Sequence, residues 1–290
     1  MNCVERTLSF ACGGESLLGI VTKPLEEKAQ TDTGVVIIVG GPQYRVGSHR
    51  QFVLLARALA ANGFPVMRFD YRGMGDSSGE LRTFENTSED IATAITALQA
   101  ATGVTGVALW GLCDGASAAL LYCHATQDAR VKGLCLLNPW VRSDTSLATT
   151  QIKHYYLRRL REKEFWLKFF SGKVAGAALA GLWRNMALAF GKAGRSKDDD
   201  RSQSFQQNMA EAWTIFGGNI LLLLSADDYT AKEFMEYVKS DDAWSSALTH
   251  PKLAVREMIG LDHTCSGTSG RHVVERHTVD WLQSCAISRA

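Results

Sequence analysis

The chain has 290 residues and is 46% hydrophobic, which is enough apolar material for one large core with an insertion. Its formal net charge of +1 argues against a nucleic-acid-binding protein, so we expect no nucleic-acid partner. The chain contains no run of about 18 or more apolar residues, so we expect no transmembrane helix.

The predicted elements begin with an antiparallel hairpin and continue as strands that alternate with helices. The hairpin strands cover 5–12 and 16–22, on either side of Gly13-Gly14. Further strands are predicted at 34–39, 107–109, 131–137, 219–225 and 252–259, and helices at 49–62, 88–101, 115–125, 231–239 and near 271–281. This alternation predicts an α/β fold with a mainly parallel, doubly wound sheet of about eight strands and helices on both faces.

The first parallel strand ends in Val-Gly-Gly-Pro-Gln at 39–43. This is similar to the H-G-G-P loop of the proline iminopeptidase branch of the α/β-hydrolases, with valine in place of histidine. Such a loop supplies one backbone N–H to an oxyanion hole, and the residue after the nucleophile supplies another. The predicted donors are Gly41 and Asp114, with Gln43 as the alternative, because Pro42 has no N–H.

A second loop, at 70–77, reads Asp-Tyr-Arg-Gly-Met-Gly-Asp-Ser. It is similar to the D-x-R-G-x-G-x-S loop that follows the fourth strand of α/β-hydrolases. In that position its part is structural. We therefore assign Asp70 and Arg72 to loop support and not to chemistry.

Residues 110–115 read Trp-Gly-Leu-Cys-Asp-Gly and follow the apolar run 107–109. This is the G-x-C-x-G pattern of a nucleophile elbow, in which a strand turns sharply into a helix, here with cysteine in place of the usual serine. The two glycines allow the strand and the helix to approach closely. We predict Cys113 as the nucleophile. The alternative is a glycine-rich turn whose cysteine is a small buried hydrophobic residue.

The acid of a triad is expected after the strand 219–225, in the turn Ala-Asp-Asp-Tyr-Thr. The carboxyl ends of parallel strands are where open α/β sheets place active residues. Asp228 is favoured over Asp227, because it lies three residues after Ser225, the spacing usual for this acid. The alternative is that the pair only caps the helix that follows, since aspartate is a good N-cap residue.

The base is predicted to be His263, on the loop after the last strand and before the closing helix. It is the one histidine of seven with the chain order and strand-end position that this role needs. A neutral imidazole takes the thiol proton or forms a thiolate–imidazolium pair with it. The carboxylate would fix the tautomer of the imidazole and stabilise its cation.

Residues 141–216 interrupt the alternation, at the place where hydrolases of this fold insert a cap. We therefore expect a core of 1–140 and 217–290 with a helical cap at 141–216. Within the cap, 151–197 hold eleven Lys or Arg against two Glu, and apolar residues recur at helical spacing. We interpret it as a lid over the active-site cleft. The alternative is contact with an anionic membrane, or with a lipid-linked or polyanionic substrate.

The seven cysteines show no C-x-x-C or other metal-ligand spacing, so we expect free thiols, no metal and no cofactor. Because we expect no signal peptide before Val4, the predicted location is the cytoplasm, with peripheral membrane contact as the alternative. Cys135 is expected to be buried core. Cys265, two residues after His263, is a weaker candidate for a place near the site.

Five segments together resemble the exosortase A system-associated hydrolases, type 1: G-G-P-Q-Y-R-V-G-S-H-R-Q, F-D-Y-R-G-M-G-D-S, W-G-L-C-D-G-A-S-A-A-L, A-D-D-Y-T-A-K-E-F and D-H-T-C-S. The likeness covers nearly the whole chain except the insert. It implies an α/β-hydrolase fold, the constellation above, and a bacterial setting of exosortase sorting and extracellular polysaccharide. A reaction is not implied. Cysteine at the elbow is also similar to dienelactone hydrolases, which open a lactone through a thioester.

The predicted chemistry is hydrolysis of an ester, lactone or thioester through a thioester acyl-enzyme on Cys113. The expected partner is a small-molecule or lipid-linked acyl substrate. Two alternatives stay open. One is an acyltransferase with an acceptor other than water, because thioesters react readily with amines and thiols. The other is a non-catalytic binding protein of an export system. The sequence predicts no oligomeric state.

Overall fold

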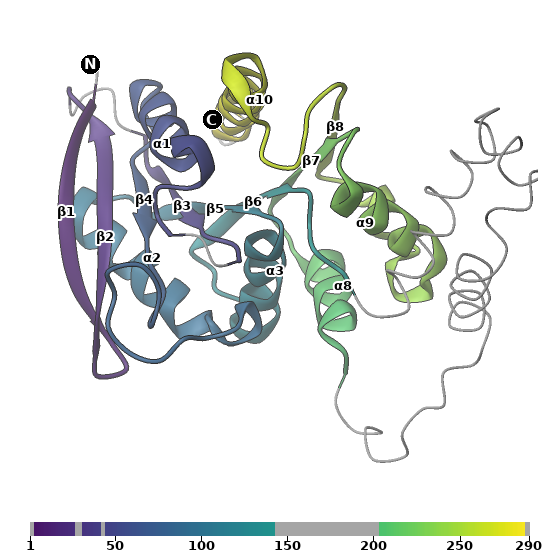
Figure 1. The fold of residues 1–290 in the computed structure, drawn as a ribbon, viewed down its shortest axis with the longest axis horizontal. Coiled ribbons are helices and arrows are strands. Elements are labelled where there is room, and N and C mark those ends of the chain that lie inside the picture. The colour runs from purple at the N-terminus through teal and green to yellow at the C-terminus, as the bar shows by residue number, and fades with distance from the viewer. Residues whose placement is uncertain (1–2, 27–30, 42–43, 143–202, 288–290) are drawn as a thin grey trace, which may run out of the picture.

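The structure is a computed structural model that describes residues 3–26, 31–41, 44–142 and 203–287. Its centre is one sheet of eight strands in the order β1-β2-β4-β3-β5-β6-β7-β8 (Figure 1). The strands are β1 (Cys3–Cys12), β2 (Glu15–Pro24), β3 (Thr33–Ile38), β4 (Val66–Phe69), β5 (Gly106–Leu112), β6 (Val131–Leu137), β7 (Asn219–Ser225) and β8 (Leu253–Met258). The predicted α/β class and the strand number are confirmed.

Strands β3 to β8 run parallel, whereas β1 and β2 form the antiparallel hairpin at one edge. The central strands β5, β6 and β7 are apolar and buried along almost their whole length. Continuous apolar runs of this kind are expected where helices cover both faces of a parallel sheet. The parallel arrangement brings the C-terminal ends of these strands to one edge, where their loops meet.

The described helices are α1 (Gln51–Ala61), α2 (Ser88–Thr102), α3 (Asp114–Thr126), α8 (Phe205–Ile215), α9 (Tyr229–Ser240) and α10 (Gly267–Ile287). Helices α1 and α10 pack together on one face of the sheet, and α2, α3 and α8 pack on the other (Figure 1). Helix α1 begins two residues later than predicted, because His49 and Arg50 have left-handed φ angles of 52° and 63°. The closing helix is longer than predicted at both ends.

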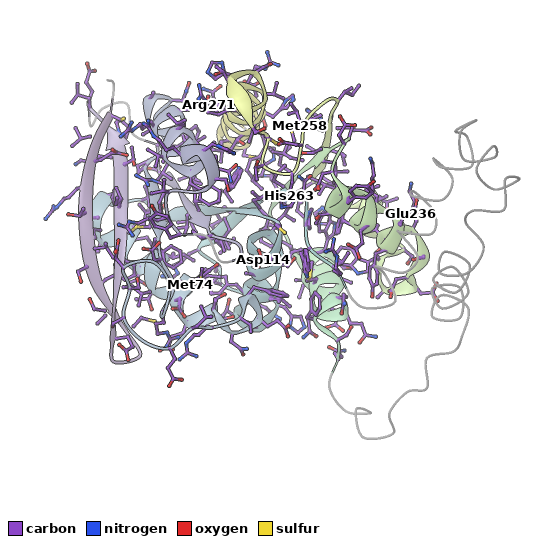
Figure 2. All side chains as sticks on the ribbon, viewed as in Figure 1. Met74, Asp114, Glu236, Met258, His263 and Arg271 are labelled. Carbon is purple, nitrogen blue, oxygen red and sulfur yellow. The ribbon has the colours of Figure 1, made fainter. Side chains whose placement is uncertain are left out.

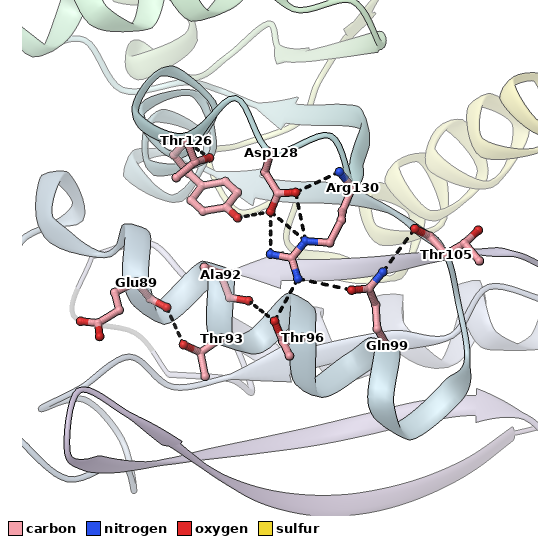
Figure 3. Close-up of polar contacts among 10 residues, drawn as sticks. Glu89, Ala92, Thr93, Thr96, Gln99, Thr105, Thr126, Asp128 and Arg130 are labelled. Atoms are coloured by element: carbon pink, nitrogen blue, oxygen red, sulfur yellow. Dashed lines mark hydrogen bonds and ion pairs between the residues drawn. The ribbon is translucent and has the colours of Figure 1, made fainter.

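A polar cluster fastens α2 to the turn before β6 (Figure 3). The Arg130 guanidinium donates to both carboxylate oxygens of Asp128, to Thr96 Oγ1 at 2.9 Å and to Gln99 Oε1 at 3.3 Å. Burial raises the pKa of Asp128, but hydrogen bonds from Arg130 and Tyr122 outweigh it and bring the pKa to about 2. The cluster lies at the N-terminal ends of the strands, so we assign it to stability and not to chemistry.

Most of the predicted cap, residues 143–202, lies outside the described residues. The described end of that range contains α8, which packs against α3 with Met209 and Trp213 buried. The Trp213 indole N–H donates to Ala247 O at 2.9 Å, which ties α8 to the segment before β8. Helix α8 therefore belongs with the helices that cover the sheet. The division into core and cap stays a prediction.

No helix within the described ranges is both long and apolar enough to span a membrane. No disulfide joins the seven cysteines, all of which lie among the described residues. Burial raises the pKa of Cys123 to about 12 and also raises that of Cys135, so both thiols stay protonated in the core. Cys113, in contrast, is only half-buried.

Candidate active site

Cys113 occupies the turn between β5 and α3 with φ 60° and ψ −126°, a conformation that side chains rarely adopt. The flanking glycines permit this turn. A Cβ on Gly111 would lie 2.5 Å from the backbone of α3, and a Cβ on Gly115 would lie 2.5 Å from Ile38 O on β3. Backbone strain held in this way by its surroundings is typical of functional positions.

Backbone hydrogen bonds hold the elbow from two sides. The Cys113 N–H donates to Leu137 O at 2.9 Å, which joins the turn to the end of β6. The Cys113 carbonyl accepts from Ala116 N–H at 3.0 Å and from Trp140 N–H at 3.2 Å. Buried Ser117 adds a hydroxyl that donates to Trp140 O at 2.6 Å. The thiol therefore projects from a backbone that is fixed by neighbouring strand ends.

His263 and Asp228 are brought together from the loops after β8 and β7. His263 Nδ1 lies 2.9 Å from Asp228 Oδ2. The same carboxylate accepts hydrogen bonds from Thr230 N–H and Ala231 N–H at 3.2 Å each and so caps α9. Capping and contact with histidine, the two interpretations of this aspartate, thus coexist. Asp227 is exposed, so of the two carboxylates it is Asp228 that meets the imidazole.

The charges of this group favour an imidazolium. The pKa of His263 is raised to about 10, first by its hydrogen bond with Asp228, then by its interaction with the Cys113 side chain, while burial opposes both. Burial raises the pKa of Asp228, but the hydrogen bond and the charge of His263, together with the N–H groups of Thr230 and Ala231, outweigh it, and the net pKa is lowered. An imidazolium between a carboxylate and a thiol is the arrangement that stabilises a thiolate.

The predicted oxyanion donors are arranged differently from the expectation. Gly41 N–H donates to Asp114 Oδ2 at 2.7 Å, so the carboxylate of one predicted donor residue takes up the N–H of the other. Asp114 itself is the first residue of α3, where N–H groups have no partner within the helix. Gln43, the alternative donor, lies outside the described residues.

Cys113, His263 and the predicted oxyanion donors Gly41 and Asp114 line one cavity of about 350 Å³ at the C-terminal edge of the sheet. His263 and Asp114 lie near each other in the centre of the molecule (Figure 2). The volume is at the small end of ligand pockets. The lining residues are Gly40, Gly41, Phe52, Leu112, Cys113, Asp114, Trp140 and His263.

Asp70 supports the loop that carries Gly41. Its Oδ1 accepts from Arg45 N–H at 2.7 Å, its Oδ2 accepts from Asp76 N–H at 3.1 Å, and the Arg45 guanidinium pairs with both carboxylates. Arg72 donates to Asp90 at 2.8 Å. Both loop residues therefore have structural partners, as expected. Arg45 was not identified from the sequence, because a single arginine in a loop carries no signal for its partner.

Asn138, also unidentified from the sequence, connects three strand ends. Its amide donates to Ser225 Oγ at 3.0 Å and to His263 O at 3.3 Å, and its Oδ1 accepts from Ser225 N–H at 2.8 Å. Cys265 Sγ lies 3.6 Å from the same Ser225 hydroxyl. Cys265 therefore lies near the loop that carries His263, but its side chain is buried. Burial is the main reason that the pKa of the Cys265 thiol is raised. The signal for Asn138 is its position directly after a buried strand.

Comparison with known proteins identifies the family and the fold. The family model described as serine aminopeptidase, S33, matches residues 30–201, more than half of the chain. This range includes Cys113 and Gly41 but neither Asp228 nor His263. Human protein ABHD12B is 38% identical over 77 residues, 27% of this chain, and the match spans only 20% of that relative's length.

Solved structures with similar folds include several hydrolases. The esterase Pf2001 of Pyrococcus furiosus has a TM-score of 0.64 at 12% identity and covers 98% of this chain and 94% of its own. An esterase of Rhizomucor miehei has a TM-score of 0.62 at 18% identity, with 99% and 85% covered. Proline iminopeptidase of Mycobacterium smegmatis has a TM-score of 0.59 at 14% identity, with 98% and 100% covered.

At these identities the similarity to solved structures concerns the fold alone. The family match does not depend on these structures, and it covers the elbow. At the elbow this chain carries Cys113, although the name of the family refers to serine. The eight-stranded sheet, the elbow and the family model agree. The chain belongs to the serine aminopeptidase S33 family of α/β-hydrolases.

Proposed function

We propose that the protein hydrolyses a carboxylic ester, lactone or thioester through Cys113, His263 and Asp228. The observation that carries this proposal is the 2.9 Å hydrogen bond between His263 and Asp228, with the imidazole also interacting with the Cys113 side chain. The three groups come from loops after β5, β7 and β8, and the thiol and the imidazole line the same cavity.

In the acylation step the thiolate of Cys113 attacks the acyl carbonyl carbon. A C–S bond forms, and the carbonyl oxygen takes the electron pair as an oxyanion. The intermediate collapses, the bond to the leaving group breaks, and His263 gives its proton to that group. The product is a thioester on Cys113.

Deacylation reverses the use of the imidazole. His263 removes a proton from water as the water oxygen attacks the thioester carbonyl. The C–S bond then breaks, Cys113 leaves as a thiol or thiolate, and the carboxylic acid is released. Asp228 stays ionised throughout and holds the imidazole in orientation, consistent with its lowered pKa.

The first experiment incubates the protein with a panel of activated esters and thioesters and measures its intact mass. We expect one acyl adduct on the natural protein and none on Cys113→Ala. Cys285→Ala is the matched control, because Cys285 is also half-buried and lies far along the chain. An adduct that survives in Cys113→Ala would contradict the proposal.

The fate of the adduct separates hydrolysis from acyl transfer. If water is the acceptor, the adduct decays at the same rate with and without added amines or thiols. Faster decay with transfer of the acyl group to one of these acceptors would support the acyltransferase, which the thioester chemistry of cysteine favours. A Cys113 that reacts neither with acyl donors nor with iodoacetamide would indicate a non-catalytic binding protein.

A further inference from the structure

The side chain of Asp114 occupies the N–H of Gly41, which is a predicted donor to the oxyanion of the proposed reaction. Its Oδ2 accepts the Gly41 N–H at 2.7 Å, and a Cβ on Gly40 would collide with its Oδ1. Oδ1 is buried and accepts no hydrogen bond from the described residues. The carboxylate therefore lies against Gly40 and Gly41, inside the cavity that Cys113 and His263 also line.

We propose that Asp114 is a gate on this site: in the observed position its carboxylate closes the oxyanion hole, and acylation of Cys113 takes place when the side chain has turned away from Gly41 or has been neutralised. The proposal rests on the proposed function. It also names a residue that decides which acyl donors react, because the incoming carbonyl has to compete with a carboxylate for the same N–H.

Two physical effects make the observed position a closed state. One is occupancy, because a single N–H that donates to Asp114 has no second hydrogen for an oxyanion. The other is charge, because a carboxylate next to a developing oxyanion raises the energy of the intermediate. Loss of one oxyanion donor typically slows acylation about 10²–10³-fold, so opening this donor is worth a measurable factor.

The closed position is held weakly enough to open. One carboxylate oxygen has its hydrogen bond from Gly41, but the other is buried without one, and turning outward would return it to water. Burial raises the pKa of Asp114, and the N–H groups of Gly41, Asp114 and Gly115 and the charge of His263 lower it by less. The carboxylate is therefore less stable here than in water.

Titratable groups face Asp114 from three sides. Cys113 belongs to the same turn, His263 lies on the loop after β8, and Tyr71 comes from the loop after β4. The buried Tyr71 hydroxyl has its pKa raised by burial and then by the charge of Asp114, so it stays neutral and donates no charge of its own. A change of charge at the gate thus has to be separated from the titration of His263.

The experiment measures two reactions of the same thiol. Alkylation by iodoacetamide needs the thiolate but forms no oxyanion, whereas acylation by p-nitrophenyl acetate needs both. The ratio of the acylation rate to the alkylation rate therefore reports the oxyanion hole and cancels the ionisation of Cys113. It is measured for the natural protein, Asp114→Ala and Asp114→Asn from pH 5 to 9, with folding followed by thermal melting.

We expect Asp114→Ala to raise the ratio about tenfold or more at pH 8, because the N–H of Gly41 is no longer occupied by a carboxylate. In the natural protein the ratio should rise as pH falls, since protonation neutralises the carboxyl, and in Asp114→Ala it should not depend on pH. Asp114→Asn keeps an acceptor for Gly41 without charge, so its ratio should lie between the two and should also not depend on pH.

An unchanged ratio in Asp114→Ala, with Cys113 still alkylated, would overturn the gate and leave the proposed nucleophile in place. A tenfold fall in the ratio would also overturn it and would make Asp114 a contributor to acylation. If Cys113 is alkylated but none of the three proteins is acylated, removal of the carboxylate in Asp114→Ala has not enabled acylation, and the gate is wrong. Failure of alkylation and acylation in every protein would instead contradict the proposed function itself.

Discussion

At the scale of single residues, one carboxylate serves two elements. Asp228 caps α9 through Thr230 and Ala231, and the same group accepts a hydrogen bond from His263. The cap holds the carboxylate in place before any substrate binds, which is what a group that orients an imidazole needs. Asp227, its neighbour in sequence, is exposed and provides a natural comparison.

Asp228→Asn is expected to lower acylation of Cys113 by up to about 10⁴-fold, because the amide no longer stabilises an imidazolium. The pKa of His263, raised to about 10 in the natural protein, should fall toward 6.5. Burst kinetics with an activated ester and NMR titration of the imidazole measure the two effects. Asp227→Asn is the control and should change neither.

The same pair predicts how stability depends on pH. Because the folded state raises the pKa of His263 from 6.5 to about 10, its stabilisation is complete below pH 6.5 and is lost as pH rises toward 10. The unfolding free energy of His263→Gln should therefore lack this fall between pH 6.5 and 10. Denaturant unfolding at several pH values checks it, and an identical pH dependence in both proteins would contradict it.

Asp114 changes stability with the same sign but at lower pH, because it is an acid whose pKa is raised by burial. The folded protein then binds this proton more tightly than the unfolded chain, so the unfolding free energy falls as pH rises above 3.8 through the raised pKa. Asp114→Asn should melt at a higher temperature than the natural protein at pH 8 and at nearly the same temperature at pH 4. Equal melting temperatures of the two proteins at pH 8 would contradict a destabilising carboxylate at this position.

At the scale of elements, the site depends on how strand ends are joined. Asn138 follows β6 in a left-handed conformation, φ 47°, and its amide connects β7 to the loop that carries His263. Asparagine suits this position because it tolerates positive φ and also supplies both a donor and an acceptor. The loop after β3 is held in a comparable way by Arg45 and Asp70.

Asn138→Gly is expected to lower the unfolding free energy by about 1–3 kcal/mol, because glycine accepts the left-handed backbone but leaves Ser225 N–H without its acceptor. Gln127→Gly is the matched control. Gln127 is also left-handed, φ 46°, but exposed, so glycine there should be neutral or slightly stabilising. Equal losses in both variants would mean that the backbone alone, without the hydrogen bonds, sets the cost.

At the scale of the whole molecule, the described residues form one sheet with helices on both faces, and most of the predicted cap, residues 143–202, lies outside them. The basic composition of 151–197 is a property of the sequence alone, and we propose it as a contact for an anionic membrane or for a lipid-linked acyl substrate. We also propose a bacterial setting of exosortase sorting and extracellular polysaccharide. This proposal rests on the sequence alone, because five segments resemble the exosortase A system-associated hydrolases, type 1.

Vesicle co-sedimentation tests the membrane proposal. We expect the protein to sediment with vesicles of anionic lipid and to leave them as salt is raised, because attraction between exposed charges is screened. Vesicles of neutral lipid are the control. Equal binding to both kinds of vesicle, or binding that salt does not change, would contradict a contact made through Lys and Arg.

The sequence by itself determined the class of fold and the positions of most elements, because buried parallel strands such as Asn219–Ser225 and Val131–Leu137 appear as continuous apolar runs. It also placed the candidate residues at strand ends, since chain order and strand order are linked in this fold. It favoured Asp228 over Asp227 by spacing alone and did not exclude Asp227, because neighbours in sequence differ only in the direction of their side chains.

The tertiary structure decided what depends on contacts between distant segments. It brought Asp228 and not Asp227 to His263, joined three strand ends through Asn138, and set the carboxylate of Asp114 on the N–H of Gly41. No local pattern carries such information, because Gly41 and Asp114 are 73 residues apart and meet only when β3 and β5 pair in the sheet. The sequence predicted Gly41 and Asp114 as oxyanion donors, and the contact between the Asp114 carboxylate and the Gly41 N–H became visible only in the fold.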